Sequence, residues 1–250
     1  MASSPTMVRV YCTCPDNIAP SLCPSSPHYM LKAVIFDLDG TLTNSDKVHF
    51  RVFQEMFALR GISIDKAIYR KKISGRQNAA ILADFLPRLS LAAREAFSGE
   101  KETTFRAIAK GKITPLPGLL PLLAQIHSQD LAAAVVTNAP PENATFMLSE
   151  LGLAERFDPV ILGDELAKGK PDPLPYQTAL EQLGIQATEA IAFEDSPSGI
   201  RSATGAGINT IGVTTTHSAK KLIGAGATAA IADFNDPSIP SLLPIDPQLS

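Results

Sequence analysis

The chain has 250 residues, 45% of them hydrophobic, which is enough for one core with a smaller appendage or for two modest domains. Its 22 basic and 25 acidic residues give a formal net charge of −3, which excludes the broad positive field that gathers nucleic acid nonspecifically. No apolar run approaches the roughly 20 residues that span a bilayer. We therefore expect neither a nucleic acid nor a membrane as a partner.

All three cysteines, Cys12, Cys14 and Cys23, lie in the first 30 residues. Without a second cluster or a nearby histidine pair they are a weak metal or disulfide signal, and the reducing cytoplasm is the expected location. Residues 1–29 are rich in Pro, Ser and Cys and lack the apolar region of a secretory signal. We expect them to form a disordered extension.

The apolar run at residues 31–36 predicts a buried strand. Residues 47–60 then have apolar positions at helical spacing, and helical patterns continue over 65–72, 78–85 and 90–110 without a convincing strand. These segments predict a small helical bundle.

From Gly118 onward the pattern alternates between helix and strand. The expected strands are 132–137, 160–162, 190–193, 210–213 and 229–232. Such alternation implies right-handed crossovers and a parallel sheet, which the strand at 31–36 is expected to join. The predicted fold is α/β, with a Rossmann-like, doubly wound parallel core of residues 31–46 and 115–250. A helical cap of residues 47–114 interrupts this core.

Two carboxylates end the first predicted strand, in the stretch Asp37-Leu-Asp39-Gly40-Thr41. Open α/β sheets bind their ligands at the carboxyl ends of strands, and two acids in different surroundings can divide the roles of nucleophile and proton donor. Taken alone, the stretch also fits a solvated Asp/Gly turn.

Further polar residues follow other predicted strands. They are Thr137 and Asn138 after one strand, Lys170 in the connection after the next, and Glu194 and Asp195 after a third. Each group alone fits a turn or a helix start. Together, an acid pair, a hydroxyl, a lysine and a second acid pair at one sheet edge predict a site for a metal and a phosphate.

In these motifs and their order, the sequence resembles the haloacid dehalogenase-like phosphohydrolases over about residues 31–235. The helical insertion is similar to that of the branch containing β-phosphoglucomutases and sugar-phosphate phosphatases. The resemblance implies a phosphatase of small phosphorylated metabolites, most simply sugar or polyol phosphates, that forms an aspartyl-phosphate. It also implies a small phosphate ester as the partner, and we expect the chain to act as a monomer.

The resemblance assigns a role to each core residue. Asp37 is the expected nucleophile and Asp39 the expected general acid and base. Thr137 and Asn138 are expected to bind the phosphoryl oxygens, and Lys170 to neutralise nucleophile and phosphate. The implied cofactor is Mg²⁺. Its expected direct ligands are the Asp37 carboxylate, the Asp39 main-chain carbonyl and Asp195. Glu194 is expected to act through a water or by contacting one of these ligands.

Three residues of the predicted cap are candidates for substrate binding. His49 and Arg76 match positions near the hinge and the substrate in the same branch, and Lys101 lies on a charged helix face. An alternative for His49 is a partly exposed helix histidine, and for Lys101 a solvated charge.

Two other functions remain open. A phosphosugar mutase of the β-phosphoglucomutase kind would keep both aspartates, although the stretch from Asn138 to Asn143 looks more like that of broad-range phosphatases. A non-catalytic metabolite-binding module would keep the fold alone. Dehalogenation is disfavoured, because true haloacid dehalogenases do not need the proton donor that Asp39 supplies.

Overall fold

The computed structural model describes residues 30–243. The extension expected over residues 1–29 lies outside the described residues. Within residues 30–243, no helix is both long and apolar enough to cross a bilayer.

A six-stranded parallel sheet lies at the centre of the described residues, with the strand order β3-β2-β1-β4-β5-β6. The strands are β1 (Ala33–Phe36), β2 (Ala132–Thr137), β3 (Val160–Leu162), β4 (Ala190–Glu194), β5 (Asn209–Val213) and β6 (Ala229–Ile231). The predicted α/β fold is thus confirmed, and every predicted strand is present.

The first strand of the chain, β1, is buried on both faces and pairs with β2 on one side and β4 on the other. On one face, the Phe36 ring stacks on Phe193 with 5.4 Å between centroids. On the other face, Ile35 packs among residues that include Tyr176. An all-apolar run fits this position, because both faces of a parallel sheet are covered by helices.

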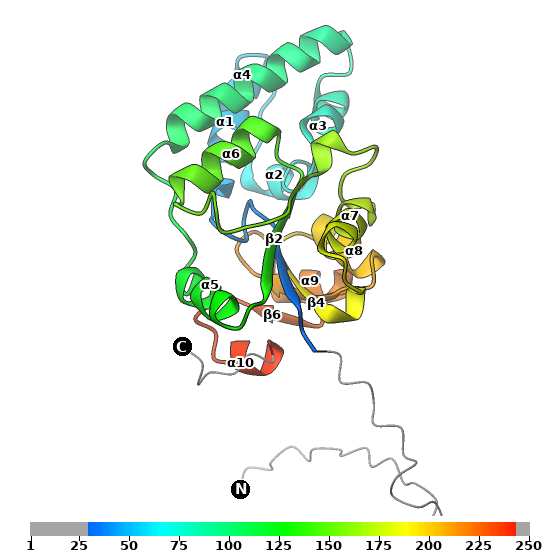
Figure 1. The fold of residues 1–250 in the computed structure, drawn as a ribbon. Helices are drawn as coiled ribbons and strands as arrows, with labels where there is room; N and C mark the ends of the chain where they lie inside the picture. The colour runs from blue at the N-terminus through cyan, green and yellow to red at the C-terminus, as the bar shows by residue number, and fades with distance from the viewer. Residues whose placement is uncertain (1–29, 244–250) are drawn as a thin grey trace, which may run out of the picture. The chain divides into compact units, whose positions relative to one another are not determined.

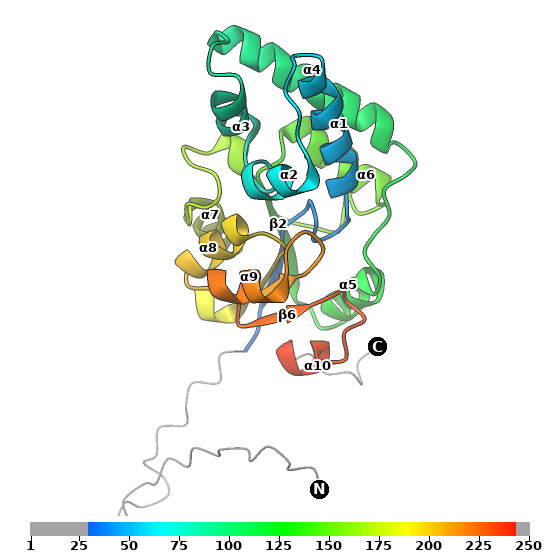
Figure 2. The same ribbon diagram turned by 180° about the vertical axis from the view of Figure 1, so that it is seen from behind.

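Helices cover both faces of the sheet (Figures 1 and 2). α7 (Leu174–Leu183) and α8 (Pro197–Gly205) pack on the face of Ile35. α5 (Leu119–Ser128) and α10 (Ile239–Leu242) contribute to the core on the opposite face. The remaining helices that follow β2 are α6 (Pro141–Glu150) and α9 (Ala219–Ala225). The short helix α10 was not predicted from the sequence.

Four of the five helices between β1 and β2 form a layer beyond the carboxyl ends of the strands (Figure 1). They are α1 (Asp46–Ala58), α2 (Lys66–Lys72), α3 (Asn78–Phe85) and α4 (Leu91–Ala109). Their apolar faces meet in an aromatic cluster, where Phe57 stacks on Phe85 at 5.0 Å and on Phe97 at 5.6 Å between ring centroids. This helical layer therefore has apolar packing of its own.

Two chain segments join the helical layer to the sheet, and they run side by side. Thr43 bridges to Pro115 in antiparallel fashion, and the Leu116 amide donates to the Leu42 carbonyl at 2.9 Å. The Thr43 hydroxyl adds a bond of 2.7 Å to the Thr114 carbonyl. Both ends of the helical layer thus leave the sheet at one place.

Candidate active site

The strand order places three of the sequence motifs next to one another. Asp37 follows β1, Thr137 ends β2 and Glu194 ends β4. Phe36 is in register with Val135 of β2 and with Phe193 of β4, so the three strands end within two residues of the same level. The convergence expected of these residues is therefore present in the structure.

Lys170 reaches this edge from the connection that follows β3 and joins two of the acids. Its ammonium donates to Asp37 Oδ1 at 2.7 Å, to Glu194 Oε1 at 2.5 Å and to the Val136 carbonyl at 2.7 Å. Burial alone would lower the pKa of Lys170, but the negative charges of Asp37 and Glu194 outweigh it and raise the pKa. The lysine is therefore a permanent cation at the centre of the site.

Three buried carboxylates surround a small volume at this point. Asp37, Glu194 and Asp195 each offer an oxygen within 4.8 Å of the others. Burial raises the pKa of Asp37 to about 7, although the charge of Lys170 acts in the opposite direction. Burial and the charges of Asp37 and Glu194 also raise the pKa of Asp195.

These carboxylates have the features of a cation site. Asp37 Oδ2 is buried and has no hydrogen-bond partner among the described residues. One lysine cannot balance three carboxylates, and buried charges are stable only when they are paired or bind a metal. A divalent cation with oxygen ligands fits this donor set.

Two hydroxyl groups orient the acids, and neither was predicted from the sequence. The Tyr176 hydroxyl donates to Glu194 Oε1 at 2.8 Å, and the Thr216 hydroxyl bonds to Asp195 Oδ2. Thr216 follows β5, so the rule that ligands gather at strand ends would have included it. Tyr176 lies inside α7, where its helical spacing indicates only a core residue.

A glycine of α8 makes room for Glu194. The Gly199 amide donates to Ser196 Oγ at 3.0 Å, and a Cβ at position 199 would overlap the Glu194 carboxylate. We expect Gly199→Ala to lower the free energy of unfolding by about 1–3 kcal/mol, the usual cost of overpacking a buried site. Urea unfolding measures this cost.

A matched control lies on the same helix. A Cβ at Gly205 would meet Pro173 only at an ordinary contact distance of 3.4 Å. Gly205→Ala should therefore leave stability unchanged or raise it, because alanine favours helix. Equal losses in both variants would contradict the close approach of Gly199 to Glu194.

Asp39 contacts the helical layer and the segment that leads to it. It accepts hydrogen bonds from the Ser45 hydroxyl and, at 3.1 Å, from His49 Nε2. Burial would raise the pKa of Asp39, but the bonds from His49 and Ser45 and the charge of Lys101 lower it below its ordinary value. In the absence of substrate, Asp39 is therefore an anion.

His49 and Lys101 form a chain that leads away from Asp39. Lys101 Nζ lies 2.9 Å from His49 Nδ1, and the His49 ring stacks on Phe105 with 3.9 Å between centroids. Lys101 is only 3% exposed, although its helix face was also compatible with a solvated charge. In the described structure, both residues support Asp39 and line the pocket.

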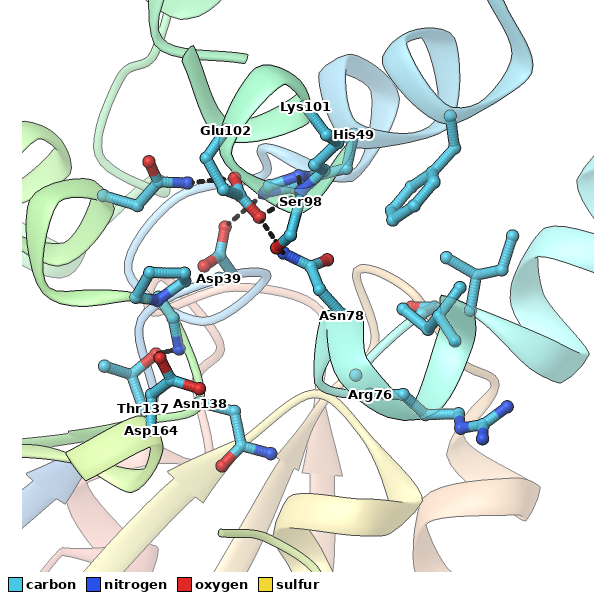
Figure 3. A pocket seen from close by; sticks show the side chains of 18 of the residues that line it. Asp39, His49, Arg76, Asn78, Ser98, Lys101, Glu102, Thr137, Asn138 and Asp164 are labelled. Carbon is cyan, nitrogen blue, oxygen red and sulfur yellow. Dashed lines mark hydrogen bonds and ion pairs between the residues drawn. The ribbon is translucent and has the colours of Figure 1, made fainter. Parts of the chain in front are cut away.

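A pocket lies between the sheet edge and the helical layer (Figure 3). Asp37, Asp39, Thr137 and Lys170 line it from the sheet side, and Asn78, Ser98 and Glu102 line it from the helical layer. Ile81 and Leu82 of α3 provide an apolar wall. A small polar molecule bound here would touch the buried acids at one end and helix side chains at the other.

Thr137 and Asn138 take different parts in the pocket. Thr137 Oγ1 accepts the Ala139 amide at 3.0 Å and lines the pocket. The Asn138 side chain accepts the Lys170 amide at 3.0 Å and donates to the Lys170 carbonyl at 3.1 Å. Asn138 thereby fixes the segment that carries Lys170, a contact that the sequence did not predict.

Arg76 lines the pocket, but its guanidinium points away from it (Figure 3). Its Nη1 donates to the Lys72 carbonyl at 2.7 Å and to Asp84 Oδ2 at 2.8 Å. To contact a molecule in the pocket, as the sequence led us to expect, Arg76 would have to leave these partners.

Comparison with known proteins places the chain in a family. Residues 34–213 match the model of the haloacid dehalogenase-like hydrolases. The chain belongs to this family and is an enzyme of its phosphatase branch. This agrees with the resemblance that the ordered motifs carry.

Three similar proteins illustrate the branch. The validoxylamine A 7'-phosphate phosphatase of Streptomyces hygroscopicus subsp. limoneus is 32% identical, over 86% of this chain and 100% of its own. The phosphorylated carbohydrates phosphatase of Thermotoga maritima is 31% identical, over 80% of this chain and 94% of its own. The crystal structure of CbbY from Rhodobacter sphaeroides in complex with phosphate superimposes with a TM-score of 0.75, at 29% identity, over 86% of this chain and 100% of that one.

Proposed function

We propose that the protein is a Mg²⁺-dependent phosphatase of sugar or polyol phosphates that acts through phospho-Asp37. The observation that carries this proposal is the group formed by Asp37, Glu194 and Asp195 around Lys170, directly below a pocket. A nucleophilic carboxylate and a fixed cation are the groups that phosphoryl transfer to an acid requires. The relatives named as phosphatases of phosphorylated carbohydrates and of validoxylamine A 7'-phosphate support the substrate class.

The Asp37 carboxylate would attack the phosphorus atom and release the alcohol part of the ester. Oδ1 is held by Lys170 at 2.7 Å, whereas Oδ2 is the atom without a partner among the described residues. Lys170 and the Thr137 hydroxyl, together with Asn138, would hold the phosphoryl oxygens.

Asp39 would give a proton to the leaving oxygen and later take one from the water that cleaves the aspartyl-phosphate. Its lowered pKa in the free protein does not suit the first step. A phosphate dianion bound beside it would raise that pKa, because a nearby like charge disfavours the carboxylate. Substrate binding would thus prepare Asp39 as an acid.

The expected ligands of Mg²⁺ are the Asp37 carboxylate, the Asp39 carbonyl and Asp195. Glu194 is bonded to both Lys170 and Tyr176, which suits contact through a water. When bound, Mg²⁺ would neutralise negative charge on the carboxylates and the phosphoryl group. Thr216 would keep Asp195 oriented toward it.

Residues 47–114 would serve as a cap over a core of residues 31–46 and 115–250. The paired connections at Thr43 and Pro115 support this division, because they provide one place about which the helical layer can move. Closure of such a layer would exclude bulk water during transfer.

Phosphate release from a panel of sugar and polyol phosphates tests the function. We expect release with Mg²⁺, loss of release after treatment with a chelator, and recovery when Mg²⁺ is restored. Conversion between phosphosugar isomers that needs a bisphosphate primer, without phosphate release, would instead identify a mutase. Binding of a sugar phosphate without any turnover would identify a non-catalytic module.

A further inference from the structure

Glu102 is a buried carboxylate on the side of the pocket opposite Thr137 (Figure 3). It is 6% exposed, and its Oε1 accepts from Asn78 Nδ2 at 2.5 Å and from Lys101 Nζ at 2.8 Å. Its Oε2 accepts from Asn143 Nδ2 at 2.5 Å. No role was predicted for it from the sequence.

These partners fix both the position and the charge of Glu102. Asn78, Lys101 and Asn143 come from α3, α4 and α6, and Arg106 orients the Asn143 amide through a bond of 2.7 Å to its Oδ1. Burial would raise the pKa of Glu102, but the charge of Lys101 and the bonds around the carboxylate lower it. Glu102 is thus an anion that cannot easily move out of the pocket.

A second carboxylate, Asp164, lines the same pocket. Its pKa is raised by partial burial and by the negative charges of Glu102 and Glu142. The charge of Glu102 therefore acts across the pocket, on Asp164 beside Thr137 (Figure 3).

The basic side chains on the helical-layer side of the pocket already have protein partners. Arg94 donates to the Leu86 carbonyl at 3.2 Å and to the Pro87 carbonyl at 2.7 Å, and Arg76 is paired with Asp84 outside the pocket. Lys101 is engaged with Glu102. Arg76 and Lys101 are thus paired with carboxylates, and Arg94 is held by two main-chain carbonyls.

We propose that Glu102 is a specificity-determining residue that admits phosphate esters whose far end carries hydroxyl groups and no negative charge. This rests on the proposed function, which places the phosphoryl group at Asp37 and Lys170. A carboxylate accepts about four hydrogen bonds, and three are in use, so Glu102 can still accept one from a substrate hydroxyl. A carboxylate or second phosphate on the substrate would instead be repelled by it.

Two matched pairs of ligands test the proposal at two chain lengths. Glucitol 6-phosphate and 6-phosphogluconate differ only in a terminal hydroxymethyl or carboxylate group, and so do glycerol 3-phosphate and 3-phosphoglycerate. Their dissociation constants are measured by calorimetry with Mg²⁺ on the Asp37→Asn variant, in which bound ester is not consumed. We expect the neutral member of at least one pair to bind about tenfold more tightly or better. Equal binding within both pairs, or tighter binding of the carboxylates, would overturn the proposal.

The charge of Glu102 is then removed with little change of shape. In the Asp37→Asn background, Glu102→Gln should lower the preference for the neutral member at least about fivefold, mainly through tighter binding of the carboxylate. Glu100→Gln removes the same charge from the exposed side of the same helix and should leave the preference unchanged. An unchanged preference in Glu102→Gln would assign the selectivity to another group and contradict the proposal.

Turnover of the same ligands by the unaltered protein separates this proposal from the function on which it rests. Absence of phosphate release from every ester, together with the expected binding preference, would reject the phosphatase function and retain the role of Glu102. Phosphate release without the binding preference would support the phosphatase function and reject the proposed role of Glu102.

Discussion

Replacing Asp37 by asparagine is expected to lower phosphate release by about a thousandfold or more, the scale on which loss of a catalytic nucleophile acts. The amide has almost the shape of the carboxylate but cannot form an acyl phosphate. The measurement is kcat for whichever sugar phosphate is turned over best, with Mg²⁺ present. Asp130→Asn is the control, because Asp130 is exposed and its φ of 53° is a conformation that asparagine tolerates.

The same variant should not be less stable than the natural protein in the presence of a chelator. Since burial raises the pKa of Asp37 from 3.8 to about 7, its ionised form destabilises the metal-free fold. Protonated Asp37 makes its full contribution to the stability of the fold below about pH 4, and this contribution is lost as the pH rises through 7. Asparagine does not ionise, so the melting temperature of the Asp37→Asn variant should not show this loss of stability as the pH rises. Unfolding of the variant at neutral pH would mean that the missing activity says nothing about the nucleophile.

Lys170→Met is expected to have the largest effect on stability. Lys170 is the cation that contacts both Asp37 and Glu194, and removing one partner of a buried ion pair costs about 3–5 kcal/mol. Catalysis should also fall by about a hundredfold or more, because a fixed positive charge is lost beside the reacting group. Urea unfolding at pH 7.5 and at pH 5 is the measurement, and the loss should shrink at acid pH as the carboxylates take up protons.

Lys168→Met provides the comparison from the same connection. Lys168 pairs with Asp172 at 3.2 Å, but its side chain is 69% exposed. Exposed pairs contribute only about 0–1 kcal/mol, so this variant should unfold close to the natural protein. If both lysine variants lost the same stability, the central place of Lys170 in the site would be refuted.

The sheet and the positions of the core residues were predictable because they follow from hydrophobic patterning. Short apolar runs ending in polar residues identified the strands, and parallel strands bring their carboxyl ends to one edge. For this reason Asp37, Thr137 and Glu194 could be expected to meet before their contacts were known. The roles given to them remain predictions that the variants above test.

Side-chain contacts between distant helices were not predictable in this way. Arg76 is placed by Lys72 and Asp84, which draw its guanidinium away from the pocket. Glu102 is in a charged helix segment that could equally have faced solvent, and in its buried position it accepts hydrogen bonds from Asn78 and Asn143 on other helices. Periodicity identifies the side of a helix, but the partner on that side depends on the tertiary fold.

The most direct test of the account is to locate the phosphoryl group on the protein during turnover. The protein is mixed with Mg²⁺ and a sugar phosphate that it hydrolyses, quenched in acid within one turnover, and digested for mass spectrometry. We predict a phosphoryl group on Asp37 that disappears as free phosphate is released. Phosphate release with no phosphorylated residue, or with the phosphoryl group on a residue other than Asp37, would contradict the account.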